Sequence, residues 1–250
     1  QSQDAPNVGP VRSLRASDFE LVANLGHPIV AFSGADKLTL QASKLAPLVP
    51  YTPDSPGASE VFHRDRKFKS PHNLFLPTTA VRATSTGSGP VQAPFTPPPP
   101  AAPPPAGLPA AGVRIHWTGF AEAVFAWDAS RHQWLRWANG RPQVDRDGTQ
   151  LGVDSVLVLD MTYGHPPRDR NQPQLDSVGS GAGLLLSTGN ATAVHWERPA
   201  PSSPFTLTGP DGAPLGLPAG RTWVAMPQAG ATTTMDAAAV AALRRAGPAG

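Results

Sequence analysis

A proline-rich stretch near the middle of the chain constrains the fold more than any other feature. Nine of the 16 residues from Pro94 to Pro109 are proline. Because proline fixes φ and lacks a backbone N–H, such a stretch is unsuited to a packed core and favours polyproline II geometry. At about 3.1 Å per residue it spans up to roughly 50 Å. We therefore expect a spacer at 85–112, although a ligand for a proline-recognising domain is an alternative. The spacer separates an amino-terminal domain (1–84) from a second domain (113–228).

The first domain is expected to be mixed α/β. Ser17 precedes an apolar-periodic run, and Glu20 follows at the spacing of a capping box, so the pattern predicts a helix that ends near Gly26. A short buried strand is expected at 29–32, and a second helix at 36–46.

Two arginines lie just before the first predicted helix. Arg12 and Arg15 flank Ser13, and a helix start attracts anions through its unpaired N–H groups and its dipole. Guanidinium groups strengthen that attraction. The pattern thus indicates an anion-binding site, the alternative being that both arginines pair with carboxylates of their own domain.

The second domain is expected to be mostly antiparallel β. Short strands with period-2 alternation are separated by turn signals, the strongest being Asn139-Gly140. This spacing favours a small sandwich or barrel-like sheet, so the overall class is α+β. Residues 229–250 are Ala-rich and are expected to form a flexible tail, helical by propensity but with few anchors.

Composition narrows the functional classes. Of the 20 basic residues only four are lysine, and the net charge is +2. No dense stripe of Lys and Arg is interleaved with aromatic residues, so a nucleic-acid partner is not expected. The chain has no cysteine, which excludes disulfides and thiolate metal sites. No run of 18 apolar residues occurs, so no transmembrane segment is expected.

Four motifs in the first half and four in the second carry a family resemblance. They are GPVRSLR (9–15), IVAFSG (29–34), FHRD (62–65), PHNLF (71–75), WD (127–128), RWANGRPQVD (136–145), GSG (179–181) and GLPAGRTWV (216–224). In this order they resemble the YerB-like bacterial lipoproteins, a two-part family whose domains have no assigned function. The resemblance covers most of residues 8–228. It implies an extracytoplasmic protein that is lipid-anchored in its full-length form. Relative to that family, the amino-terminal domain is expected to be truncated and incomplete.

The resemblance also implies which polar residues lie together. The set expected to bind a ligand is Arg12, Ser13, Arg15, His63, Arg64, His72 and Asn73. We expect a ligand-binding or scaffolding module with an anion-binding cleft in the first domain. Compatible partners are a cell-wall glycan or peptide, another small anionic ligand, a phospholipid headgroup and an envelope protein.

Three alternatives stay open for this polar set. It could act as a cell-wall hydrolase, with His72 as base and Ser13 as hydroxyl, although no Gly-x-Ser-x-Gly elbow is present. It could equally be a buried hydrogen-bond network that braces the domain. The chain could also lack activity because upstream strands are missing.

Other motifs favour structural roles. The histidines lack the i, i+4 spacing of zinc peptidases, so no metal and no cofactor are expected. Asp145, Asp147-Gly148 and Asp154 only partly match a calcium loop, and an Asp-Gly turn explains them better. The glycines at 179–183 lack the helix and the Lys of a phosphate loop, which favours close backbone packing. All six tryptophans fall in the second domain, where core packing is favoured over sugar stacking.

Overall fold

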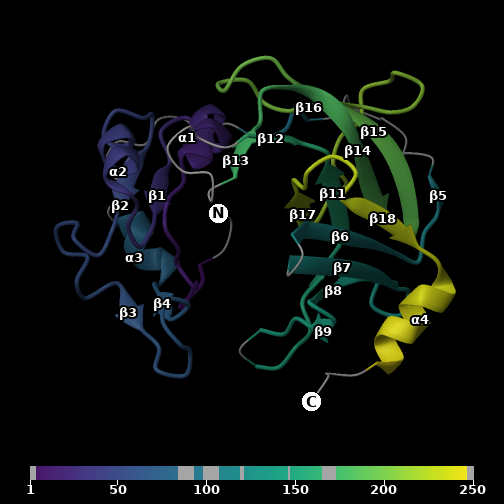
Figure 1. Cartoon of the computed structure of the whole chain (residues 1–250), viewed down its shortest axis with the longest axis horizontal. Helices are drawn as coiled ribbons and strands as arrows, with labels where there is room; N and C mark the ends of the chain where they lie inside the picture. Colours follow the sequence, from purple (N-terminus) through teal and green to yellow (C-terminus); the bar gives the residue numbers. More distant parts are fainter. Residues whose placement is uncertain are drawn as a thin grey trace. The chain divides into compact units, whose positions relative to one another are not determined.

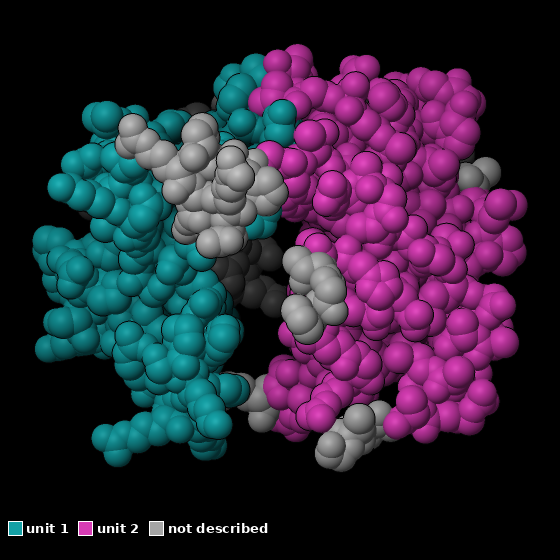
Figure 2. Space-filling view, viewed as in Figure 1, with its two compact units in different colours: residues 1–94, 166–177, 200–204 teal, residues 95–165, 178–199, 205–250 magenta. Residues whose placement is uncertain are grey.

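The computed structural model describes residues 4–83, 93–97, 107–118, 121–145, 147–164 and 173–246. The chain divides into two units, coloured separately in Figure 2. Unit 1 holds residues 1–94, 166–177 and 200–204, and unit 2 holds residues 95–165, 178–199 and 205–250. Short helices and mostly antiparallel strands confirm the α+β class.

Unit 1 combines short helices with short strands (Figure 1). Its elements are α1 (Ala16–Val22), a 3-10 turn η1 (Ala23–Leu25), β1 (Ile29–Ala31), α2 (Lys37–Ser43), β2 (Val49–Tyr51), β3 (His63–Arg64), β4 (Leu74–Phe75), α3 (Thr78–Ala83) and β13 (Gln174–Asp176). Strands β1 and β2 pair in parallel, and β3 and β4 form an antiparallel hairpin. The core of the unit gathers Tyr51, Ala58, Phe62, Leu74 and Leu76.

The amino-terminal segment before α1 runs between β4 and the end of β1. Val8 exchanges backbone hydrogen bonds with Leu76 at 2.8 and 3.0 Å. Further along, the N–H of Leu14 donates to the carbonyl of Gly34 at 2.9 Å. The segment thereby brings residues 8–14 against the β3–β4 hairpin.

Helix α1 begins differently from the sequence prediction. Its N-cap is Arg15, whose backbone N–H donates to the Asp18 carboxylate at 2.8 Å. The predicted capping box of Ser17 and Glu20 is therefore wrong. Glu20 instead accepts hydrogen bonds from the backbone N–H and the hydroxyl of Ser177, 157 residues away in sequence.

Unit 2 contains two sheets. The first has the order β10 (Gly152–Val153), β8 (Gln133–Ala138), β7 (Ala121–Asp128), β6 (Gly112–Thr118) and β18 (Thr232–Met235), with β9 (Arg141–Pro142) beside β8. The second has the order β16 (Thr206–Thr208), β15 (Asn190–Arg198), β14 (Gly179–Ser187), β11 (Ser155–Leu159) and β17 (Thr222–Ala225), with β5 (Leu108–Pro109) beside β15. Strand β12 (Thr162–Gly164) also belongs to this unit. Pairing is antiparallel except between β11 and β17.

The core of unit 2 lies between these sheets. One buried cluster takes Val113, Ile115, Ala123, Phe125 and Trp134 from the first sheet and Val156, Val158, Leu186 and Ala225 from the second. A sandwich therefore forms, one of the two architectures that the strand pattern predicts. Glycine allows the close approach within the second sheet, because a Cβ at Gly183 would lie 2.5 Å from the carbonyl oxygen of Val158.

The carboxy-terminal segment differs from the expected flexible tail. Residues 232–245 form β18 and helix α4 (Ala237–Arg245). Val240 of α4 is buried in a cluster with Val124, Ala126, Leu135, Trp137 and Met235, on the face of the first sheet opposite the sandwich core. Asp236 caps the helix by accepting the N–H of Ala239 at 2.7 Å. The expectation of a flexible tail with few anchors is therefore not met for residues 232–245, where a buried valine and a capped helix start hold the segment on the sheet.

Most of the expected linker lies outside the described residues, namely 85–92 and 98–106. Its carboxy-terminal end departs from a free spacer, because β5 pairs with β15 and Gly112 begins β6. No described helix is long and apolar enough to cross a membrane.

Candidate functional site

A basic hairpin is the most highly charged part of unit 1. We define it as residues 63–75, which comprise β3, β4 and the loop between them. Its exposed residues include His63, Arg64, Arg66, Lys67, Lys69 and His72. Between residues 63 and 72 the sequence has four Lys or Arg residues and one carboxylate, Asp65. This concentration of cations contrasts with the net charge of +2 for the whole chain.

Two tight turns shape the loop of the basic hairpin. Asp65 begins the first turn, where its carboxylate accepts the N–H of Lys67 at 2.9 Å and its carbonyl accepts the N–H of Phe68 at 3.2 Å. The second turn is closed by the N–H of His72 donating to the Lys69 carbonyl at 2.9 Å. Both turns use backbone groups or Asp65, and the side chains of Arg66, Lys67 and Lys69 are exposed.

The buried ring of Phe75 packs against two side chains of the hairpin. Its ring lies 5.3 Å from the ring of Phe68 and 6.3 Å from that of His63, centroid to centroid. Gly9 approaches the same ring from the amino-terminal segment. His63 is therefore an exposed ring stacked on a buried one.

Arg12, which lies in the amino-terminal segment, contacts the basic hairpin. Its Nη1 donates to the carbonyl of Pro71 at 2.8 Å, while Arg64 donates to the side-chain oxygen of Asn73 at 2.7 Å. Both guanidinium groups stay exposed. The structure thus brings Arg12, Arg64 and Asn73 into one local group with the exposed histidines at 63 and 72.

The described hydrogen bonds do not join Arg15 or Ser13 to this group. The side chain of Arg15 donates to the carbonyl of its neighbour Leu14 at 3.3 Å, and its backbone is tied to Asp18. Burial raises the pKa of Asp18, and the nearby Arg15 partly opposes that rise. Ser13 is half-buried, and no described hydrogen bond joins it to His72. The expected cleft uniting Arg12, Arg15 and α1 is not formed by the described contacts.

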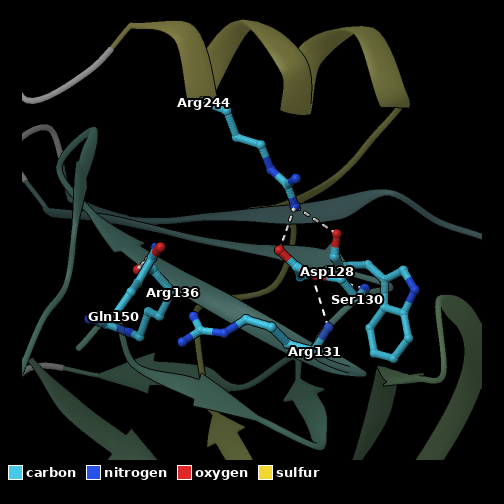
Figure 3. Close-up of polar contacts among 7 residues, drawn as sticks. Asp128, Ser130, Arg131, Arg136, Gln150 and Arg244 are labelled. Atoms are coloured by element: carbon cyan, nitrogen blue, oxygen red, sulfur yellow. Dashed lines mark hydrogen bonds and ion pairs between the residues drawn. The ribbon is translucent and has the colours of Figure 1, made fainter.

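A pocket in unit 2 escaped the sequence analysis. It has a volume of about 270 Å³ and lies under α4, lined by Asp128, Leu135, Trp137, Pro142, Gln150, Leu243 and Arg244. Arg244 reaches from α4 to the sheet, donating to the Trp127 carbonyl at 2.9 Å and lying 3.8 Å from the Asp128 carboxylate (Figure 3). The signal in the sequence is the spacing of Val240, Leu243 and Arg244 after the capping Asp236.

The Asp128 carboxylate accepts hydrogen bonds that favour its ionised form. It accepts the hydroxyl of Ser130 at 2.6 Å and the backbone N–H of Arg131 at 3.2 Å. These hydrogen bonds lower the pKa of Asp128, and the bond from the Ser130 hydroxyl has the largest effect. The positive charge of Arg244 lowers it further. Through its ion pair with Arg244, the Asp128 carboxylate therefore holds α4 and forms part of the pocket wall.

Arg136, from the RWANGRPQVD motif, packs between aromatic rings. Its guanidinium carbon lies 4.6 Å from the centre of the Trp223 ring and 5.7 Å from that of Phe125. Burial lowers its pKa. Cation–π contact explains how a half-buried arginine is held there.

The calcium-like loop is an Asp-Gly turn. Asp145 accepts the N–H groups of Asp147 and Thr149, both at 3.1 Å. Hydrogen bonds with the Asp145 side chain and with Thr149 lower the pKa of Asp147 to about 2. Within the described residues, no group of three or more His, Asp or Glu side chains is arranged to hold a metal ion.

Two family models match the chain, one for each half. Residues 1–91 match the N-terminal domain, and residues 113–224 the C-terminal domain, of a protein of unknown function, DUF3048. The chain belongs to the DUF3048 family. This membership confirms the two-part, YerB-like family that the motifs indicate.

The fold of this DUF3048 chain is similar to a solved structure. The crystal structure of YerB protein from Bacillus subtilis aligns with a TM-score of 0.75 and 19% identity, over 94% of this chain and 80% of that chain. At this identity the likeness establishes the fold alone. A search of curated proteins found no match.

Proposed function

We propose that this chain is a ligand-binding module of the bacterial cell envelope. In this proposal the basic hairpin and Arg12 hold a ligand that carries phosphate or carboxylate groups. The envelope location rests on the resemblance to lipoproteins, and the ligand class rests on the charges of unit 1.

The observation that carries the proposal is the charge of one exposed hairpin. Arg64, Arg66, Lys67 and Lys69 are all exposed, and Arg12 is fixed beside them through Pro71. Cations gathered on one surface create a local positive potential that attracts anions even when the net charge is small. Arginine adds planar, bidentate donors for phosphate or carboxylate oxygens.

A hydrolase receives no support from this geometry. A serine nucleophile needs a base within hydrogen-bond reach. No described hydrogen bond joins the Ser13 hydroxyl to the His72 ring, although Arg12 beside Ser13 contacts Pro71 beside His72. We therefore propose binding without turnover.

The test is a charge-matched pair of variants titrated with inorganic polyphosphate. The chain has four lysines, two on the basic hairpin (Lys67, Lys69) and two at the ends of α2 (Lys37 and the C-cap residue Lys44), all exposed. The variants K67Q/K69Q and K37Q/K44Q change the net charge equally. We expect the hairpin variant to lose at least tenfold in affinity at low salt, and the α2 variant to lose little.

Salt gives a second readout. Because exposed charges are screened, raising the ionic strength to 1 M, where the Debye length is about 3 Å, should abolish binding of the wild type. Equal affinities of the two variants, or no polyphosphate binding by the wild type, would refute the proposal.

A further inference from the structure

Phe68 breaks the polar character of the basic hairpin. It is 43% exposed although it is one of the largest apolar side chains. In sequence it stands between Lys67 and Lys69, with Arg66 one residue further. The first turn, closed by the bond from the Phe68 N–H to the Asp65 carbonyl, fixes all of them on the same short loop.

The exposed ring has a rigid support. It packs at 5.3 Å against Phe75, which is 5% exposed. One face of Phe68 is thus used for packing while the rest of the ring faces solvent. An aromatic ring held at the tip of a cationic loop can enter a membrane interface without first becoming ordered.

We infer that the ligand of the basic hairpin is the surface of an anionic lipid bilayer, into whose interface Phe68 inserts. The inference rests on the proposed function, since it names the source of the anionic groups. Aromatic rings favour the headgroup region, and neighbouring Lys and Arg side chains contact anionic headgroups. A soluble polyanion would use the cations but would gain little from the exposed ring.

Helix α2 offers the strongest competing surface. It combines Lys37 and the C-cap residue Lys44 with two exposed leucines, Leu38 at 55% and Leu45 at 90%. It provides two lysines, however, and the capping carboxylate of Asp36 lies at its start. The basic hairpin, with four Lys or Arg residues and Arg12 alongside, matches an anionic surface better.

The experiment measures binding of the full chain to vesicles of phosphatidylglycerol and phosphatidylcholine, with pure phosphatidylcholine for comparison. We expect binding only to the anionic vesicles. Each cation near such a surface contributes about fivefold in affinity, so K67Q/K69Q should lose about 25-fold. Phe68→Ser should lose about tenfold on vesicles while its polyphosphate affinity stays unchanged. Leu45→Ser and K37Q/K44Q serve as matched controls.

A second variant guards against misfolding of Phe68→Ser. Phe68→Trp keeps an aromatic ring against Phe75 and should bind vesicles at least as tightly. Because the chain already has six tryptophans, the expected readout is a blue shift in the emission difference between the variant and the wild type upon vesicle binding. Polyphosphate binding without vesicle binding would overturn the bilayer inference and leave the proposed function intact. Absence of both would overturn both. Vesicle binding that is unaffected by Phe68→Ser, or lost equally in the α2 controls, would also overturn the inference.

Discussion

Gly9 lies directly against Phe75, at a distance that no other residue type allows. A Cβ atom at residue 9 would be 2.5 Å from Cδ1 of the ring and 2.6 Å from the carbonyl oxygen of Leu74. This contact places the amino-terminal segment on the same buried ring that supports Phe68 and His63. The GPVRSLR motif and the hairpin motifs are therefore parts of one structure.

Gly9→Ala should destabilise unit 1. The added methyl group must displace both a buried ring and a backbone carbonyl, which costs about 2 kcal/mol. Urea denaturation of the variant and the wild type measures the change in the free energy of unfolding. The exposed substitution Thr79→Ala on α3 is the control, and an equally small effect of both would contradict the contact.

Gly183→Ala should destabilise unit 2 in the same way. Its Cβ would lie 2.5 Å from the Val158 carbonyl oxygen and 2.9 Å from a methyl of Val194. Strands β11, β14 and β15 would have to separate, at a cost of about 2 kcal/mol. Gly164→Ala is the matched control, because a Cβ there meets no atom within 4 Å. The comparison is again made by urea denaturation, and equal midpoints would argue against the close approach.

Asp128→Asn should weaken unit 2 in a pH-dependent manner. The pKa of Asp128 in the folded chain lies below its ordinary value of 3.8. Its ionised form therefore stabilises the fold above about pH 4, and this contribution is lost as the pH falls through the folded pKa. We expect a loss of about 1 kcal/mol at pH 7, which shrinks below pH 4. Thermal unfolding from pH 2 to 7 measures it, and a pH-independent difference would contradict the assignment.

Val240→Ala should release α4. The side chain is 6% exposed and packs against the first sheet. Removing two buried methyl groups costs about 2 kcal/mol of stability. This loss exceeds the gain in helix propensity when alanine replaces valine at one position of the nine-residue helix. Hydrogen exchange of residues 237–245 should accelerate, whereas Arg245→Ala, an exposed change on the same helix, should leave it unaltered. Unchanged protection in both variants would show that the helix is held by other contacts.

Local turn chemistry was predictable from the sequence. Asn139 and Gly140 adopt φ values of 49° and 74°, and Thr188 and Gly189 values of 47° and 78°, as tight hairpins require. Such turn types are specified largely by the residues of the turn itself. The antiparallel sheets of unit 2 could therefore be anticipated.

Hydrogen-bond partners that are distant in sequence could not be predicted from local spacing. Ser17 and Glu20 have the spacing of a capping box, yet Glu20 bonds to Ser177 instead. Spacing cannot reveal a partner 157 residues away. The grouping of Arg12 with residues 71–73 was predicted from the family resemblance. The pocket under α4 could not be predicted, because the sequence does not show which face of the helix is buried.

The bond between Glu20 and Ser177 has a consequence for how such chains can be divided. Unit 1 includes residues 166–177 and 200–204, which are encoded within the second half of the sequence. A gene cut in the proline-rich stretch would deprive the first half of β13 and leave the Glu20 carboxylate without its Ser177 donors. The first half alone is therefore not a complete unit, and we expect a fragment that ends in the proline-rich stretch to be less stable than the same residues in the full chain.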